Sequence, residues 1–191
     1  MPMTGSTQVV KRTYPWTDTF DGLRTTFRLM TRDDRDAVVA FATQQPESDR
    51  VFLRINITDP AVVDEWLDNI ERGRTVTVFA ESEHGLIGYA SLHHNEMLWT
   101  SHMAEIRVLV DHATRGKGIA HRLVGELLHI ARAMRLERLI CQVPADQDRV
   151  RHMFESLGFQ PEAILPDWIR TPDGALRDLM ILSMYLRPFG A

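Results

Sequence analysis

The sequence has no long apolar run and only one cysteine. No apolar stretch approaches the ~20 residues that a membrane-spanning helix needs. The N-terminal segment MPMTGSTQVVKRTYPW has no continuous apolar core like that of a secretory signal. Cys141 cannot form an internal disulfide, which is typical of a reducing compartment. We therefore expect a cytoplasmic protein with no membrane partner, in which Cys141 is a buried structural thiol rather than a nucleophile.

An excess of positive charge is also lacking. The chain carries 22 Lys and Arg residues against 26 Asp and Glu, for a net charge of −4 and a pI near 6.0. Proteins that bind nucleic acid use a broad basic surface, so no nucleic-acid partner is expected, and any polyanion must be held locally. The eight histidines form no His-x-x-x-His or carboxylate–histidine motif, so we expect no metal site.

The length and the order of the elements favour one domain. No repeat or low-complexity segment divides the 191 residues. Residues 1–22 are polar, and we expect them to form a loose arm or an early edge element ahead of a domain spanning 23–191. Strands are predicted at 25–30, 74–82, 86–94, 104–111, 138–144 and on both sides of the turn TPDG (171–174). Helices are predicted from Thr31, from Pro60, over 117–134 and over 146–159. This order indicates an α/β domain built on a mixed sheet.

A glycine-rich turn, RGKG, joins the strand predicted at 104–111 to the helix that follows it. Gly116 and Gly118 let the backbone approach an anion, and the amides at a helix start point outward toward it. Arg115 and Lys117 add positive charge, so a diphosphate fits this turn. The turn is not a P-loop, because no Ser or Thr follows Gly-Lys, and it lacks the third glycine of the dinucleotide fingerprint, where His121 stands. A turn without a ligand is the simpler alternative.

The region around this turn resembles a known family. AEIRVLVDHATRGKGIAHRLV resembles the acetyl-CoA-binding motif of the GNAT N-acetyltransferase superfamily, whose core Arg/Gln-x-x-Gly-x-Gly/Ala reads Arg115-x-x-Gly118-x-Ala120 here. LICQVP and FESLGF are similar to the strand and helix that follow in that family, and the order of elements agrees from about residue 25 to 187. The resemblance implies an α/β (α+β) GNAT fold, with a mixed, mostly antiparallel twisted sheet of six to seven strands flanked by about four helices.

The same resemblance implies how the coenzyme binds. Acetyl-CoA would be the cosubstrate, with its diphosphate on the backbone of 116–121 and its pantetheine arm along a bulged central strand. Gln147 stands where the family often has an asparagine. The full set of coenzyme-binding residues implied is Val108, Leu109, Val110, Arg115, Gly116, Lys117, Gly118, Ile119, Ala120, His121 and Gln147.

A narrower resemblance concerns catalysis. TRDDRDAVVAFATQQPESDRVFLRI resembles the opening of bacterial protein-lysine acetyltransferase domains, in which a glutamate at the start of the central strand is the catalytic base. Glu105 matches that position. A lysine with a pKa of about 10.4 is neutral only ~0.04% of the time at pH 7, so a positioned base matters for direct attack on the thioester in a ternary complex. A solvated carboxylate or an ion pair with Arg107 is the alternative for Glu105, and His93 and His94 are rival bases.

The motifs do not identify the general acid or the amine acceptor. Many members of the family use a tyrosine to protonate the departing thiolate where this chain has Phe154; Ser156 or Tyr185 could replace it. We expect protein lysine as the acceptor first and a small amine second, and a non-catalytic acyl-CoA sensor is the alternative function. Residues near 44–60, the 95–103 loop and the TPDG turn are expected to line the acceptor site. Acidic residues that could receive a cationic amine there are Asp49, Asp59 and Asp64. The oligomeric state is not readable.

Overall fold

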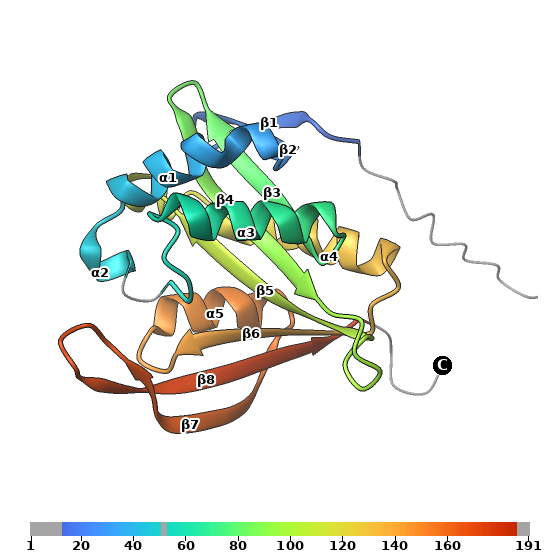
Figure 1. Ribbon diagram of the computed structural model, residues 1–191, viewed down its shortest axis with the longest axis vertical. Coiled ribbons are helices and arrows are strands. Elements are labelled where there is room, and N and C mark those ends of the chain that lie inside the picture. The colour runs from blue at the N-terminus through green and yellow to red at the C-terminus, as the bar shows by residue number, and fades with distance from the viewer. Residues whose placement is uncertain (1–12, 51–52, 187–191) are drawn as a thin grey trace, which may run out of the picture.

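A single eight-stranded sheet forms the centre of the protein (Figure 1). The computed structural model describes residues 13–50 and 53–186. The strands lie in the order β1-β2-β3-β4-β5-β6-β8-β7, and every neighbouring pair is antiparallel except β5 with β6. The strands are β1 Trp16–Phe20, β2 Leu23–Leu29, β3 Thr75–Ser82, β4 Gly85–His94, β5 Met103–Val110, β6 Arg138–Pro144, β7 Gln160–Arg170 and β8 Leu176–Tyr185. The expected mixed, mostly antiparallel sheet is confirmed.

Helices cover both faces of this sheet. They are α1 Arg35–Gln44, α2 Glu47–Arg50, α3 Pro60–Glu71, α4 Ile119–Ala133 and α5 Asp148–Ser156, with short 3₁₀ turns at Arg32–Asp34 and His112–Thr114. One apolar core joins the sheet to α4 and α5, and a second joins its other face to α1 and α3. In Figure 1, α3 crosses in front of the central strands and α4 passes behind them. No helix in the described ranges is long and apolar enough to cross a bilayer.

The sheet has one strand more than the six to seven expected, because part of the N-terminal segment pairs with it. Trp16–Phe20 forms β1 at the edge, antiparallel to β2. The ring of Trp16 stacks on Phe27 with centroids 4.5 Å apart, and the Arg122 guanidinium lies over the Trp16 ring at 4.5 Å from its centroid. For residues 16–20, the edge element is therefore the correct alternative. Residues 1–12 of the expected arm lie outside the described residues.

Strands β5 and β6 pair only at their beginnings. Met103–Glu105 runs parallel to Arg138–Ile140, and beyond these residues β5 follows β4 while β6 follows β8. The two strands therefore diverge and leave one edge of β5 without a strand partner. The bulge expected in β5 is not found, since its register with β4 is continuous from Gly88↔Val110 to His94↔Ala104. No bulge is needed, because the loss of β6 as a neighbour already frees the outer edge of β5.

Gly88 allows β4 to pack closely against the end of β5. A Cβ at this position would lie 2.9 Å from the Leu109 carbonyl oxygen and 3.2 Å from the Val110 Cα, both backbone atoms that cannot rotate away. We predict that Gly88→Ala lowers the free energy of unfolding by about 1–3 kcal/mol through overpacking. Chemical denaturation measures this change.

Gly125 provides the matched control. It lies inside α4, and a Cβ there would meet nothing within 4 Å. Gly125→Ala should stabilise the protein by roughly 0.5–1 kcal/mol, because alanine is the better helix former. Equal effects of the two substitutions would contradict the close contact at Gly88.

Candidate active site

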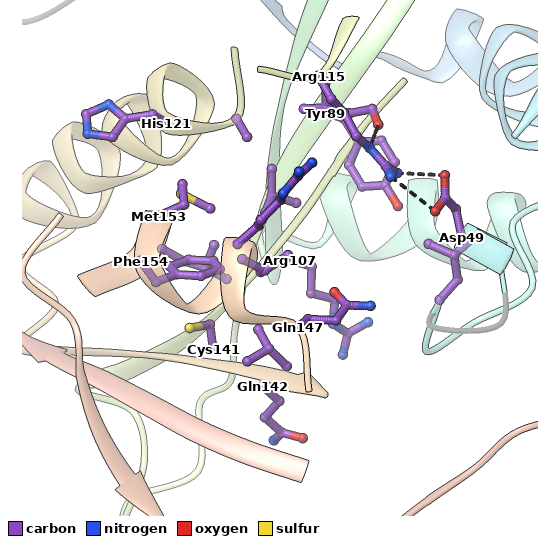
Figure 2. A pocket seen from close by; sticks show the side chains of 18 of the residues that line it. Asp49, Tyr89, Arg107, Arg115, His121, Cys141, Gln142, Gln147, Met153 and Phe154 are labelled. Carbon is purple, nitrogen blue, oxygen red and sulfur yellow. Dashed lines mark hydrogen bonds and ion pairs between the residues drawn. The ribbon is translucent and has the colours of Figure 1, made fainter. Parts of the chain in front are cut away.

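A cavity of about 930 Å³ opens where β5 and β6 diverge. Its first part, the turn lobe, is lined by Val108, Val110, three residues of the RGKG turn (Arg115, Gly116 and Gly118), the start of α4, and α5. Its second part, the arginine lobe, is lined by Leu53, Arg54, Ile55, Trp66, Tyr89, Ser91, His93 and Arg107. Figure 2 shows side chains from both lobes around one continuous space. A molecule extended along β5 would therefore reach from one lobe into the other.

The turn lobe presents backbone amides to this space. Gly118 is the N-cap of α4, with a left-handed φ of 83°, and Gly116 has the same φ. Within the described parts of the chain, the amides of residues 116–121 find no backbone acceptor. A Cβ on Gly116 or Gly118 would meet nothing within 4 Å, so the space around the turn is open. Free amides at the positive end of a 15-residue helix fit a diphosphate.

Most residues implied to bind the coenzyme line the cavity, and two do not. Those that line it are Val108, Val110, Arg115, Gly116, Gly118, Ile119, Ala120, His121 and Gln147. The Leu109 side chain lies on the same face of β5 as Arg107, opposite to Val108 and Val110, and packs in the α1–α3 core without lining the cavity. The Lys117 ammonium lies 2.9 Å from the Asp21 carboxylate in the β1–β2 turn, where it lowers the pKa of Asp21. The side chains of Leu109 and Lys117 are thus placed away from the cavity.

Arg115 connects the turn to α2 (Figure 2). Its Nη2 and Nη1 donate to the two Asp49 carboxylate oxygens at 2.7 and 3.2 Å, and its Nε lies 3.4 Å from the Val110 carbonyl oxygen. Asp49 therefore already has a cationic partner and is not free for an amine. The other two expected acids are also engaged, Asp59 as the N-cap of α3 and Asp64 with Arg35.

Glu105 lies beside the arginine lobe between two arginines. Its Oε1 accepts a close hydrogen bond from Arg54 Nη1, and Arg107 Nε and Nη2 lie 3.4 and 3.5 Å from its two oxygens. The Glu105 side chain is 17% exposed and does not line the cavity, whereas both arginines do. The ion pair with Arg107, one of the alternatives drawn from the sequence, is present, and Arg54 adds a second that the sequence did not suggest.

His93 faces the cavity next to this cluster. It lies opposite Glu105 in the β4–β5 register, and its Nδ1 is hydrogen-bonded to Thr75 Oγ1 at 3.1 Å. Burial, helped by the charges of Arg107 and Arg54, lowers the pKa of His93 to about 4. The imidazole is therefore neutral at pH 7. His94 does not line the cavity, and its Nε2 lies 2.5 Å from the Gly73 carbonyl oxygen.

A hydrogen-bonded chain of three side chains supports the arginine lobe, and two of them, Trp66 and Ser91, line it. Trp66 Nε1 donates to Thr77 Oγ1 at 3.2 Å, and Thr77 Oγ1 is 2.9 Å from Ser91 Oγ. Tyr89 lies next to them, and burial raises the pKa of its hydroxyl. The sequence did not indicate a role in the site for Trp66, Thr77, Ser91 or Tyr89. The period-two alternation along β4 and β5 could have placed Tyr89, Ser91 and His93 on the same face as Arg107.

The wall formed by α5 and β6 is apolar where a tyrosine acid would be needed. Phe154 is 1% exposed and packs edge-to-face on Phe159 with centroids 5.1 Å apart. Neither possible replacement lines the cavity, because Ser156 donates to the Met153 carbonyl and Tyr185 accepts from Arg138. Cys141 lines it but is buried, and that burial raises the pKa of its thiol. A buried, protonated thiol agrees with its structural role.

Of the other segments expected to line the acceptor site, one lies at a cavity and one does not. The TPDG turn reaches the entrance of the arginine lobe through Thr171 and Pro172, which line a second cavity shared with Leu53–Ile55. The 95–103 loop lines neither cavity. Its apolar side chains Met97, Leu98 and Trp99 are 69%, 92% and 91% exposed, so they point into solvent instead.

Comparison with known proteins finds the same family throughout. A profile of the Acetyltransferase (GNAT) family matches residues 13–159. A protein named as a phosphinothricin acetyltransferase in Bacillus subtilis is 28% identical over 169 residues, covering 84% of this chain and 99% of its own. An amino-acid acetyltransferase of Mycobacterium tuberculosis is 32% identical over 106 residues, covering 54% and 58%. The crystal structure of the ribosomal-protein-alanine N-acetyltransferase of Brucella melitensis superposes with a TM-score of 0.73, at 26% identity over 83% of this chain and 98% of that one.

The position of His93 predicts a pH-dependent stability. Because the folded state lowers its pKa from 6.5 to about 4, the neutral form is favoured by folding. The contribution of His93 to the free energy of unfolding is fully present above pH 6.5 and is lost as the pH falls toward 4. NMR titration of the imidazole should give a midpoint near 4, and His93→Gln should flatten the decline in the free energy of unfolding between pH 6.5 and 4. A midpoint near 6.5 would show that the ring is solvated.

Proposed function

The chain belongs to the GNAT acetyltransferase family and is an acetyl-CoA-dependent N-acetyltransferase; we propose that its acceptor is a small, amino-acid-like primary amine. The observation that carries this proposal is the continuity of the cavity. A lobe with free helix-start amides opens directly into a lobe with two arginines, a neutral histidine and a serine. Such a cavity can hold an acyl-coenzyme and a compact polar acceptor together.

In the proposed complex, the turn lobe holds the coenzyme. The amides of residues 116–121 would bind the diphosphate, and the free outer edge of β5 at Val108–Val110 would pair with the pantetheine amides. Leu109 would contribute through its backbone, since its side chain packs in the α1–α3 core. Gln147, the N-cap of α5, would reach the same arm from the β6 side. The thioester then lies between the two lobes.

Glu105 remains our candidate for the base in the arginine lobe. It lies on the β5 edge of that lobe, and a proton from the amine would reach it directly or through one water. The thiolate can take its proton from water, because a thiol pKa near 8.5 makes this protonation easy at neutral pH. This route requires no side-chain acid and is compatible with Phe154. It also requires that Glu105 release one of its arginine contacts.

The charges of the lobe favour a small amino acid over a lysine side chain. The names of the relatives in Bacillus and Mycobacterium refer to phosphinothricin and amino acids, which carry an acidic group near the amine. A protein lysine, the acceptor expected first from the sequence, would bring a lone ammonium toward Arg54 and Arg107 without an anionic group to balance them. A protein N-terminus is the closer alternative, in line with the name of the Brucella protein.

An acceptor screen tests the proposed function. Purified protein with acetyl-CoA is supplied with L-amino acids, polyamines, lysine peptides and peptides with a free N-terminal alanine, and free thiol release is measured. We expect turnover with one or more amino acids. Turnover with lysine peptides alone would restore the lysine assignment. Tight acetyl-CoA binding without turnover on any amine would favour the non-catalytic sensor.

Gly118 tests the coenzyme site. Gly118→Ala should weaken acetyl-CoA binding about tenfold or more, because a Cβ at φ 83° strains the turn and shifts the amides of the α4 N-terminus. Isothermal titration calorimetry measures the Kd. Gly174→Ala is the matched control, since its φ of 86° gives similar strain in the β7–β8 turn. If both substitutions weaken coenzyme binding equally, the turn is not the diphosphate site.

Glu105 tests the proposed base. Glu105→Gln keeps the size of the side chain but cannot take up a proton, so we expect kcat to fall by about 10²–10⁴-fold with an unchanged Kd for acetyl-CoA. Glu96→Gln, on the exposed 95–103 loop, is the control. Turnover within about threefold of the parent protein in Glu105→Gln would exclude Glu105 as the base and leave His93, which faces the lobe, as the next candidate.

A further inference from the structure

We propose that the acceptor carries a carboxylate or similar anionic group that displaces Glu105 from Arg54, and that this exchange frees a Glu105 oxygen to take the proton of the amine. This inference rests on the proposed N-acetyltransferase function. It adds that every good acceptor carries an anionic group as well as the amine. It also assigns Arg54 as the residue that recognises this group.

The acidic side chains that line the main cavity do not balance its arginines. Each of them is already paired: Asp49 with Arg115 at 2.7 Å, Asp146 with Arg177 at 2.6 Å, and Asp148 with Arg151 at 2.9 Å. In the arginine lobe, Arg54 and Arg107 share the single carboxylate of Glu105, and His93 is neutral at pH 7. The lobe therefore carries one uncompensated positive charge, which a single anionic group on the acceptor would neutralise.

The surface next to the arginine lobe is also positively charged. A second cavity of about 480 Å³ shares Leu53–Ile55 with the first and is lined by Arg50, Arg54 and Arg170 but by no acidic residue. Within residues 13–50 and 53–186, no carboxylate pairs with Arg50 or Arg170. A basic entrance attracts an anionic group and repels a lone ammonium ion. It therefore selects acceptors before they reach the thioester.

Arg54 is the arginine that can exchange partners. It lies outside any helix or strand, and its side chain is 43% exposed, against 29% for Arg107 on β5. It contacts Glu105 through Nη1 alone, so its remaining donors are available to a second carboxylate. A guanidinium binds a carboxylate best through two parallel hydrogen bonds, and the Arg54–Glu105 contact does not use this geometry. An incoming carboxylate can use it.

The exchange links recognition of the acceptor to the chemical step. While Arg54 holds Oε1, its guanidinium occupies one side of this Glu105 oxygen and competes for it with an incoming amine or water. Once Arg54 turns to the acceptor carboxylate, Glu105 keeps only the longer contacts with Arg107, at 3.4 and 3.5 Å. The neutral amine then forms the C–N bond as the C–S bond breaks. One N–H proton passes to Glu105 and, through water, to the departing thiolate, which leaves N-acetylated acceptor and free thiol.

Matched acceptors test the anionic group. The standard L-amino acids are compared with the corresponding L-amino-acid amides, which differ only in the carboxylate. We expect kcat/KM to be about 10- to 100-fold higher for the acids, the value of one charge-assisted hydrogen-bonded pair. The amides have the less basic and therefore more reactive amine at neutral pH, so a preference for acids cannot come from amine reactivity.

Arg54→Gln tests the recognition residue. It should remove most of the preference for acids in two ways: kcat/KM for the acids falls about tenfold or more, and turnover of the amides rises because Arg54 no longer holds Glu105. Arg24→Gln, which removes an exposed arginine from β2, is the control and should retain the preference. Acetyl-CoA binding is measured for all proteins, so that a folding defect is distinguished from a loss of recognition.

Activation by a separate anion tests the exchange itself. Acetate added to the parent protein should fill the Arg54 position and raise the turnover of an amino-acid amide, relative to chloride at equal ionic strength, and it should have no such effect in Arg54→Gln. Amides acetylated as fast as acids, or acetate acting only as an inhibitor, would overturn the proposal while N-acetyltransferase activity stands. Failure of all acids and amides despite acetyl-CoA binding would instead overturn the proposed function.

Discussion

The divergence of β5 from β6 is the constraint on which the rest of the site depends. A parallel pair that continued beyond Glu105 and Ile140 would fill the space that the cavity occupies. Because β6 turns toward β8 and β5 stays with β4, each strand remains hydrogen-bonded on one side and the sheet does not lose its continuity. The cavity therefore lies inside a stable sheet rather than in a mobile surface loop. Gly88 supports this arrangement, since its missing side chain lets β4 hold the free end of β5 closely.

Two kinds of positive potential meet in this cavity, and they have different physical origins. In the turn lobe the potential comes from backbone amides and the dipole of α4, so it is rigid and needs no charged side chain. In the arginine lobe it comes from flexible guanidinium groups that share one carboxylate. A rigid amide site suits a coenzyme that is the same in every turnover. A site made of exchangeable ion pairs suits an acceptor that must be distinguished from other amines.

The fold and the turn lobe could be predicted from the sequence because their signals are local. Two glycines at a strand-to-helix junction, and apolar residues at helical spacing after Ile119, locate the turn lobe, while the order of the elements and the family resemblance indicate the sheet. The arginine lobe could not, because Arg54, Trp66 and Arg107 come from three elements far apart in the chain. Asp49 shows the same limit. The sequence suggests a free acid, and only the folded chain brings Arg115 within 2.7 Å of it.

Phe154 now has a simple explanation in terms of the energies of the two proton transfers. The amine must lose a proton against a large pKa difference, whereas the thiolate gains one near its own pKa of about 8.5. A dedicated base is therefore worth far more to this reaction than a dedicated acid. The apolar contact of Phe154 with Phe159 strengthens the wall of the cavity at little loss to the chemistry. The polar residues are concentrated instead beside Glu105, where the more difficult proton transfer would take place.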